Sequence, residues 1–584
     1  MRTIGLTENA RSSGGTQYFS GYNHCLRTDA GEVFDCKNMT MDEYPFLASR
    51  SPRGKIAFPG DVKVRDLLVA DVAMDEVLYV NAYIVQTETS IEVYDAELNH
   101  LIQLAADLEE EQKMVLHGAY LVCFPSTKYY NILDLGGDDN GVFGYTVSAG
   151  GASPLEFKPC KSDGEPIATT KPANPATGDL WNDNGTIYSW SASSNSWIPE
   201  QDVYTSIRNH EICLKIVGVA EPGDIIDFGN NISLVYWGAN VGTNDSVSAV
   251  IFKGNLTKSL GGGSVVITAT HRVPNFDFVF ESNNRIWGCY YGLNEDGEAI
   301  NEIYASALGD FRNFYKYEGI STDAWTATIG VPGKWTGGCK YGTYPTFFKE
   351  NAIVRVYGEY PSTYGTYTSN FRGVKPGNGD SLCIVNETLY YNSPAGIVAY
   401  TGGLPYNVDS KLHETFETVI AGRYRGKLYL SCTRKDGSTC LLVYDTVKQM
   451  WIKEDALNVK RFIATADNLF MITDSDTYTV AGGDEAFEWN FETAMLGLEY
   501  ADHKYISRVQ MRIEGEGEIG VYISYNGDDW EDCVHYVCRG ITPIVADIPA
   551  RRCDYFRLRV EGVGAAKVLT LNYLVESGSD NIET

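Results

Sequence analysis

Long apolar runs are missing from this chain of 584 residues. No stretch is long enough to cross a bilayer as a helix, and the segment from Met1 to Gly15 lacks the apolar centre of a signal peptide. The sequence therefore predicts neither a membrane anchor nor export through a signal peptide.

Positive charge is also scarce, because 47 Lys and Arg face 76 Asp and Glu, for a formal net charge of −29. Stable binding of DNA or RNA needs basic side chains that displace counterions from phosphates, so a nucleic-acid reader is not expected. A conduit along which DNA slides without being bound is compatible with this negative net charge. Acidity that merely keeps a large protein soluble fits it equally well.

Signatures of catalysis and metal binding are absent as well. The eight histidines form no His-x-x-x-His or His-Glu-x-x-His spacing, and neither a Gly-x-Ser-x-Gly elbow nor a Walker-type phosphate loop occurs. The nearest approach to a zinc site, Cys533, His535, Cys538 and Cys553, favours unpaired structural thiols by its spacing. The acidic segment 134–140 fails the alternating pattern of a calcium loop. We therefore predict a protein that is not an enzyme, with no catalytic residue, no metal and no cofactor.

Disulfide-framework spacing is missing too, although the chain has 13 cysteines. The number is odd, and several cysteines lie in or beside apolar, strand-like segments, where a reduced thiol behaves as a small hydrophobe. These are Cys25, Cys123, Cys289, Cys383 and Cys432. The pattern favours free thiols and folding in a reducing compartment.

Tyrosine and glycine are abundant, at 39 and 58 residues. Tyrosine favours the half-buried surface of a sheet, and glycine supplies turns with positive φ, so the two together indicate many short strands joined tightly. The composition predicts an all-β protein.

One strand outline recurs along the chain: an apolar strand containing Leu-Tyr or a relative, a polar turn, and a strand resembling Val-Tyr-Asp. From Tyr304 onward the second strands recur at roughly 35 to 55 residues, the period of one four-stranded propeller blade. The sequence therefore predicts a β-propeller. The first strands of the six copies contain Leu78-Tyr79, Ile286-Trp287, Phe347-Phe348, Leu389-Tyr390, Leu428-Tyr429 and Leu469-Phe470.

The outline and its interruptions predict five segments. Residues 1–60 form an extended N-terminal arm, residues 61–150 the first part of the propeller and residues 271–490 the second part. Residues 151–270 hold short strands without the outline, which predicts an inserted small β-domain or domains. Residues 491–584 alternate apolar and polar residues, which predicts a C-terminal β-sandwich. Leucine spacing from Leu98 to Gln112 would also fit a helix, but the flanking strands favour strand and loop.

The insertion contains the one group of side chains that could bind a ligand by stacking. Trp181, Trp190 and Trp197 lie in a polar segment rich in glycine and serine, and exposed indoles there could stack on sugar rings. The alternative is that the three indoles form the small core which this segment needs in order to fold.

Several short strings resemble tail proteins of double-stranded DNA bacteriophages, of the type whose β-propeller forms the tail tube or nozzle. The strings are Asn38-Met39 and Tyr44-Pro45, Asn283 to Gly288, Glu302 to Asp310 with Asn313-Phe314, Phe347 to Asn351, and Tyr444-Asp445 with Trp451. The segment from Pro172 to Trp181 is similar to small modules on phage tail and fibre proteins.

The resemblance implies a structural component of a phage tail that forms a ring, with six copies favoured, around the DNA exit channel. The implied partners are other copies of the chain, the head-to-tail adaptor or connector, other tail proteins, and DNA in passage. The implied location is the virion tail, after folding in the bacterial cytoplasm. A second hypothesis is a virion protein that binds a receptor or a glycan of the host surface through the tryptophan segment or the sandwich. A third is a carbohydrate-active enzyme on a propeller, which would require a defined pair of carboxylates.

Overall fold

The computed structural model describes residues 11–577, apart from 61, 242–246, 295–296, 499–502, 547 and 550. The first ten residues of the predicted arm and the last seven of the predicted sandwich therefore lie outside the described residues. Within the described part, fifty strands occur with a single α-helix, α1 (Glu211–Val217), and two short 3-10 helices, η1 (Pro361–Thr363) and η2 (Gly379–Ser381). The all-β class is confirmed. None of these helices has the length and apolar character needed to cross a membrane.

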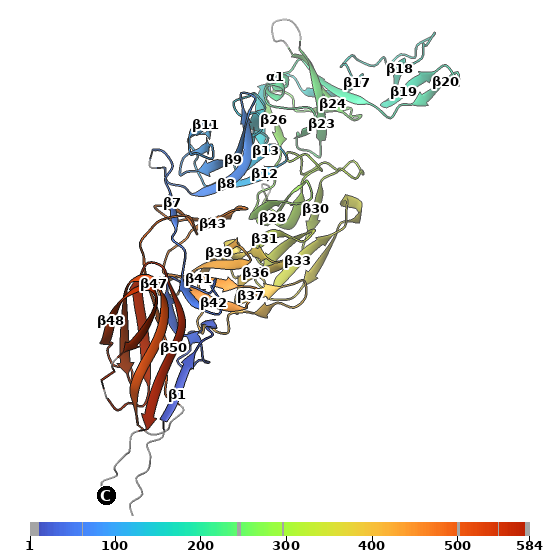
Figure 1. Ribbon diagram of the computed structural model, residues 1–584. Helices are drawn as coiled ribbons and strands as arrows, with labels where there is room; N and C mark the ends of the chain where they lie inside the picture. The colour runs from blue at the N-terminus through green and yellow to red at the C-terminus, as the bar shows by residue number, and fades with distance from the viewer. Residues whose placement is uncertain are drawn as a thin grey trace, which may run out of the picture.

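Seven antiparallel sheets of four strands each form the middle of the molecule (Figure 1). Six of them are built from consecutive strands. The first sheet consists of β8 (Asp66–Met74), β9 (Val77–Gln86), β10 (Ile91–Tyr94) and β11 (His100–Ala105). The second consists of β12 (Lys113–His117), β13 (Tyr120–Phe124), β14 (Lys128–Asn131) and β15 (Asn140–Val142). The third sheet consists of β27 (Phe278–Glu281), β28 (Ile286–Leu293), β29 (Ala299–Ala305) and β30 (Trp325–Thr328). The fourth consists of β31 (Trp335–Tyr341), β32 (Tyr344–Lys349), β33 (Ala352–Tyr357) and β34 (Gly365–Ser369).

The fifth sheet contains β35 (Cys383–Val385), β36 (Thr388–Ser393), β37 (Gly396–Tyr400) and β38 (Tyr406–Asn407), and the sixth contains β39 (Thr418–Tyr424), β40 (Lys427–Thr433), β41 (Thr439–Asp445) and β42 (Met450–Lys453). The seventh combines both ends of the chain, because β43 (Arg461–Ala464), β44 (Leu469–Ile472) and β45 (Thr477–Thr479) take their fourth strand from β7 (Gly54–Ile56). Thr477 pairs with Ile56, and Thr479 with Gly54. The N-terminal arm thus completes the last sheet.

Most central strands of these sheets, such as β32, β36 and β40, are buried on both faces, which explains their continuous apolar runs. Successive side chains of a strand point to opposite faces. In β32, Phe347 accordingly packs against the third sheet, while Phe348 packs against the fifth. A strand that serves two cores cannot alternate apolar with polar residues.

Each of the seven sheets packs against the next, and the seventh packs against the first. Separate apolar clusters join the first sheet to the second, the second to the third, the third to the fourth and the fourth to the fifth. A larger cluster spans the fifth, sixth and seventh sheets. Phe470 and Ile472 of β44 then meet Leu67 and Val85 of the first sheet. The sheet-to-sheet contacts therefore form a closed cycle.

An eight-stranded, barrel-like sheet interrupts this series between the second and third four-stranded sheets. Its strands wrap around one apolar core, to which α1 contributes Ile212, Cys213 and Ile216. The strands, in their order across the sheet, are β16 (Tyr145–Gly151), β26 (Val265–His271), β22 (Ile225–Asp227), β23 (Ser233–Val241), β24 (Val247–Lys253), β21 (Tyr204–Arg208), β17 (Leu155–Cys160) and β25 (Lys258–Leu260).

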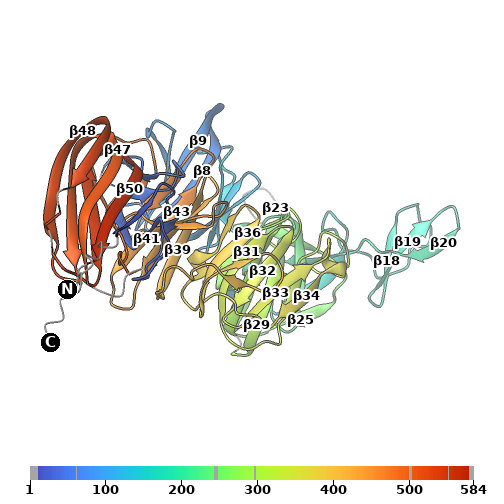
Figure 2. The same ribbon diagram turned by 60° about the horizontal axis from the view of Figure 1, so that its bottom comes forward.

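A three-stranded sheet, composed of β18 (Leu180–Asp183), β19 (Thr186–Ser191) and β20 (Ser196–Pro199), is inserted within the eight-stranded one. Figures 1 and 2 both show it standing away from the body, at the end opposite the C-terminal strands.

A nine-stranded sheet at the other end joins the C-terminal strands to the N-terminal arm. Its C-terminal members are β46 (Glu488–Glu492), β47 (Lys504–Tyr525), β48 (Glu531–Ala546), β49 (Phe556–Val563) and β50 (Ala566–Ser577). The arm contributes β1 (Arg11–Thr16), β4 (Asp35–Lys37), β5 (Met39–Thr40) and β6 (Leu47–Ser49), while β2 (Gly21–Tyr22) and β3 (Glu32–Val33) pair with each other. The arm is therefore an integral part of two sheets. The region considered as helix or strand after Leu98 contains the strand β11, which confirms the strand interpretation.

Candidate functional site

The three tryptophans predicted to contact glycans lie on one face of the projecting sheet. Trp190 is paired with Trp197 across β19 and β20, and Trp181 is paired with Tyr188 across β18 and β19. Tyr188 and Trp190 are two residues apart, so all four rings share a face. We call this set (Trp181, Tyr188, Trp190 and Trp197) the aromatic face.

The rings of the aromatic face contact one another in series. Trp181 stacks on Tyr188 with centroids 5.5 Å apart, and Trp197 meets Trp181 and Trp190 edge to face at 5.7 and 5.5 Å. All four side chains are half-buried, whereas Ile187, on the opposite face, is fully buried. The indoles therefore hold the small sheet together and still present part of their surface to solvent.

Polar groups contact Trp181, the tryptophan of strand β18. The Trp181 indole Nε1 donates a hydrogen bond to the Thr169 carbonyl oxygen at 3.2 Å, and the Lys171 Nζ lies 4.7 Å from the centre of the Trp181 ring. An aromatic row beside an ammonium group suits a ligand with apolar C–H faces and hydroxyl groups.

A second polar site was not foreseen from the sequence. It is the Arg461 cluster, in which Arg461 at the start of β43 faces Asp66, Glu111 and Asp380. Its guanidinium nitrogens lie 2.8 Å from an Asp380 oxygen, 3.1 Å from a Glu111 oxygen and 3.6 Å from an Asp66 oxygen. Asp66 begins β8, Glu111 precedes β12, and Asp380 lies in η2 before β35. Four sheets thus meet at one guanidinium.

Burial controls the charges in the Arg461 cluster. The side chains of Arg461 and Asp66 are 18% and 13% exposed. Burial raises the pKa of Asp66, and the nearby guanidinium opposes that rise. Burial alone would lower the pKa of Arg461, but the three carboxylates outweigh it and raise that pKa. Arg461 is consequently a fixed cation. No signal in the sequence could have revealed this cluster, because its members lie far apart in the chain.

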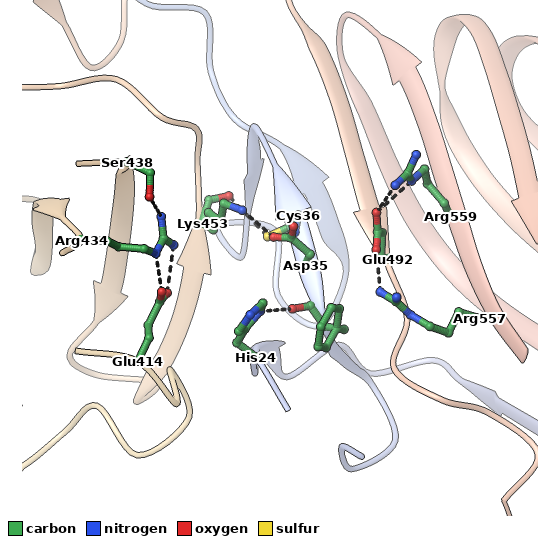
Figure 3. Close-up of polar contacts among 11 residues, drawn as sticks. His24, Asp35, Cys36, Glu414, Arg434, Ser438, Lys453, Glu492, Arg557 and Arg559 are labelled. Atoms are coloured by element: carbon green, nitrogen blue, oxygen red, sulfur yellow. Dashed lines mark hydrogen bonds and ion pairs between the residues drawn. The ribbon is translucent and has the colours of Figure 1, made fainter. Parts of the chain in front are cut away.

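A third group of polar side chains lies on both sides of the N-terminal arm, at the sixth four-stranded sheet and at the nine-stranded sheet (Figure 3). Asp35 of β4 pairs with Lys453 of β42 at 2.7 Å. On the other side, Glu492 of β46 bridges Arg557 at 2.6 Å and Arg559 at 2.5 Å. Burial would lower the pKa of Lys453, but Asp35 outweighs it and raises that pKa. The pair of Asp35 and Lys453 thus attaches the arm to the sixth sheet, whereas the Glu492 pairs join β46 to β49 within the nine-stranded sheet.

The cysteine and histidine group considered for zinc does not assemble. Cys538 and Cys553 are buried, the Cys553 thiol points to the Lys504 carbonyl oxygen, and His535 contacts Asp532 and Glu518. Among the described residues, no group of three or more His, Cys, Asp or Glu is arranged to hold a metal ion. All 13 cysteines are free thiols, in agreement with the prediction of mostly free cysteines.

The acidic segment considered for calcium is a hydrogen-bonded turn before β15. Asp139 accepts hydrogen bonds from the Tyr120 hydroxyl at 2.8 Å and the Asn131 amide at 3.1 Å, and the Asn140 amide donates to the Gly137 carbonyl. Its polar groups are directed at one another, as in an ordinary turn.

No protein-family profile matches the chain, and no curated protein is similar to it in sequence. Among solved structures, an exo-β-1,3-galactanase from Phanerochaete chrysosporium is 9% identical, with a TM-score of 0.15, over 50% of this chain and 94% of that protein. The WD40 domain of SCAP from fission yeast is 8% identical, with a TM-score of 0.21, over 93% and 98%. The extracellular domain of a putative one-component system from B. thetaiotaomicron is 10% identical, with a TM-score of 0.13, over 92% and 98%. Function must therefore be argued from this chain's own residues.

Proposed function

We propose that the seven four-stranded sheets form a β-propeller, with the eight-stranded sheet as an inserted β-domain. Two observations support this arrangement. The sheets contact one another in a closed cycle, and β7 supplies the missing outer strand of the last sheet. In addition, Arg461 of the seventh sheet reaches residues at the start of the first, second and fifth sheets, although only the sixth and first are its neighbours in the cycle. First strands that converge on a common axis account for such contacts.

The C-terminal strands are proposed to form a β-sandwich, folded about the long strand β47. The first half of β47 pairs with β50 and its second half with β49, while β48 runs along the other edge. Buried side chains from both halves, including Val509 and Val521, belong to one apolar cluster. A sheet that bends back on itself would produce this pattern.

On this fold, we propose that the protein is a structural component of a bacteriophage tail and assembles as a ring, with six copies favoured. The observation that carries the proposal is the Arg461 cluster, because one guanidinium pairs with carboxylates from three distant segments of the seven-sheet body. Such cross-links favour a scaffold that keeps its shape. The sequence strings that resemble phage tail nozzles supply the setting.

The same cluster indicates where DNA would pass. If ion pairs occupy the middle of each propeller, the exit channel has to lie between copies of the chain in the ring. A net charge of −29 would let DNA slide along that channel without sticking. The expected neighbours are other copies, the head-to-tail adaptor or connector, and further tail proteins.

The test is the oligomeric state of the purified protein, alone and with its tail partners. Light scattering after gel filtration should give a multimer of the 64.6 kDa chain, and negative-stain images should show a ring with an axial hole. A monodisperse monomer, even with its tail partners present, would contradict the tail-ring proposal.

The aromatic face supports a second function, binding of a glycan on the host surface. The sheet projects from the body (Figure 2), and its four aromatic side chains, which share one face, are half-buried. This arrangement would present stacking surfaces to a polysaccharide without hindrance from the rest of the molecule.

Alanine substitutions test this second function. Trp181→Ala, Trp190→Ala and Trp197→Ala should each weaken binding to host cell-wall polysaccharide about tenfold, the loss of one stacking contact. Trp237→Ala, which truncates a 46% exposed tryptophan of β23, is the matched control and should bind normally. Equal binding by all four variants would refute glycan binding at the aromatic face.

A further inference from the structure

A large cavity lies where the eight-stranded sheet meets the third four-stranded sheet. Its volume is about 540 Å³, within the range of roughly 300–1,000 Å³ found for ligand sites. One wall comes from β22 and the end of β26, and the other from β28, β29 and the segment 313–317. It is well separated in sequence from the aromatic face, which comprises residues 181–197.

Tyrosines dominate one wall of this cavity. Tyr290 and Tyr304 come from β28 and β29, and Tyr315 and Tyr317 follow in the segment after β29. Tyr304 and Tyr315 contact edge to face with centroids 6.3 Å apart. We call this cavity the tyrosine pocket. Tyr290, Tyr315 and Tyr317 keep part of their surface exposed and can offer apolar faces and polar edges, whereas Tyr304 is only 3% exposed.

Carboxylates are held in place beside these rings. Glu302 of β29 accepts a hydrogen bond from the Tyr304 hydroxyl at 2.5 Å and one from the Thr328 hydroxyl at 3.4 Å. Thr328 is its cross-strand partner in β30. Two donors from the same sheet therefore fix the Glu302 carboxylate before any ligand arrives, which lowers the ordering cost of binding. Glu298 adds a second carboxylate at the rim.

The opposite wall supplies one cation. The Arg272 Nε lies 3.1 Å from an Asp227 oxygen, and both residues line the cavity. Three carboxylates (Asp227, Glu298 and Glu302) against one guanidinium leave a formal excess of two negative charges. An anionic ligand such as a phosphate or a sugar acid would be repelled, whereas a neutral ligand rich in hydroxyl groups would find acceptors, a donor and stacking surfaces together.

We infer that the tyrosine pocket is a binding site for a neutral mono- or disaccharide. Its carboxylates accept hydrogen bonds from the sugar hydroxyls, Arg272 donates one, and the tyrosine rings pack on the C–H faces. The site is independent of both the tail-ring proposal and the aromatic face.

Titration calorimetry of the full chain with a panel of neutral mono- and disaccharides tests this inference. Glu302→Gln keeps the shape of the side chain and should weaken binding at least tenfold, because a hydrogen bond to a charged acceptor is lost. Tyr317→Ala should weaken it about fivefold to tenfold. Tyr367→Ala is the matched control for the latter, since Tyr317 and Tyr367 are 58% and 59% exposed, and it should bind normally.

Three outcomes would overturn the inference. The first is that no saccharide of the panel binds. The second is that choline or spermidine binds in its place, which would make the pocket a cation site. The third is that saccharide binding survives Glu302→Gln and Tyr317→Ala but is lost in Trp190→Ala, which would assign it to the aromatic face. Thermal melting of each variant separates a loss of affinity from a loss of folding.

Discussion

At the scale of single residues, Arg461 connects segments that lie far apart in the chain, and no sequence motif predicts these contacts. Its partners lie at or shortly before the first strands of three other sheets, and two of them, Glu111 and Asp380, are more exposed than Asp66. Removal of the guanidinium would leave Asp66 buried without its counter-charge, and an uncompensated buried charge is strongly destabilising.

We therefore expect Arg461→Met to destabilise the seven-sheet body by about 2 kcal/mol, less than the roughly 3–5 kcal/mol of a fully buried pair because two partners are half-exposed. Calorimetric melting would show a lower transition temperature. Arg551→Met, which removes exposed pairs with Asp528 and Glu531, is the control and should cost well under 1 kcal/mol. Equal effects in both variants would mean that the Arg461 cluster does not hold the sheets together.

Lys349 is a second residue whose environment alters its charge. Its ammonium group is buried, donates to the Asn301 side-chain oxygen at 2.9 Å, and lies 4.2 Å from the centre of the Trp335 ring. Burial lowers the pKa of Lys349 to about 8, although Cys289 and Asp277 oppose this. The usual value for lysine is about 10.4.

Because the pKa of Lys349 is lower in the folded protein than in the unfolded chain, its contribution to the free energy of unfolding depends on pH. Between about pH 8 and 10.4 the unfolded chain binds more protons at Lys349 than the folded chain, so the contribution of Lys349 to stability rises with pH in that window. NMR of isotopically methylated lysines should show one signal that titrates near pH 8 and is missing in Lys349→Arg. If the signal missing from Lys349→Arg titrates above pH 10, the lysine is not buried as described.

At the scale of elements, the sequence revealed the central hairpins but not the outer strands. The recurring outline corresponds to the second and third strands of a sheet in all six copies, for example β40 and β41. Most of these strands are buried on both faces and therefore read as apolar runs, whereas in the first half of β9 Leu78 and Val80 are 59% and 55% exposed. The hairpin of β13 and β14, with Tyr120-Leu121 and Tyr129-Tyr130, belongs to the second four-stranded sheet, whose strands the outline does not include.

Outer strands leave little trace in a sequence, because one edge and much of their surface lie outside the core. β38 has two residues, and β7 consists of Gly54, Lys55 and Ile56, which carries no pattern at all. The pairing of β7 with β45 depends on contacts across more than 400 positions, which local periodicity cannot encode. The tyrosine pocket was missed for the same reason, since its walls come from separate sheets.

The closure by β7 can be tested with one glycine. A side chain on Gly54 would meet the Thr479 hydroxyl, which lies 2.4 Å from the position of a Cβ atom. We expect Gly54→Val to push β7 from β45 at a cost of about 1–3 kcal/mol. Lys55→Val, in the same strand and with an exposed side chain, is the control. Hydrogen exchange of residues 54–56 and 477–479 should accelerate in Gly54→Val alone. Unchanged exchange there would show that β7 does not depend on this close packing.

At the scale of the whole molecule, the N-terminal arm connects parts that the chain order separates. It contributes four strands to the nine-stranded sheet and one to the last four-stranded sheet, and Arg53 pairs with Glu454 and Asp455 between them. The projecting three-stranded sheet, on which the aromatic face lies, is at the far end of the molecule from the C-terminal strands (Figure 1).

The propeller arrangement is tested most directly by a single-particle cryo-electron microscopy map of the assembled protein at side-chain resolution. The account predicts seven four-stranded sheets around one axis, β7 as the last outer strand, density linking Arg461 to its three carboxylates, and a channel that runs between copies. Sheets stacked in a line or divided among separate sandwiches, or an open cleft with a pair of unpaired carboxylates where Arg461 should lie, would contradict it.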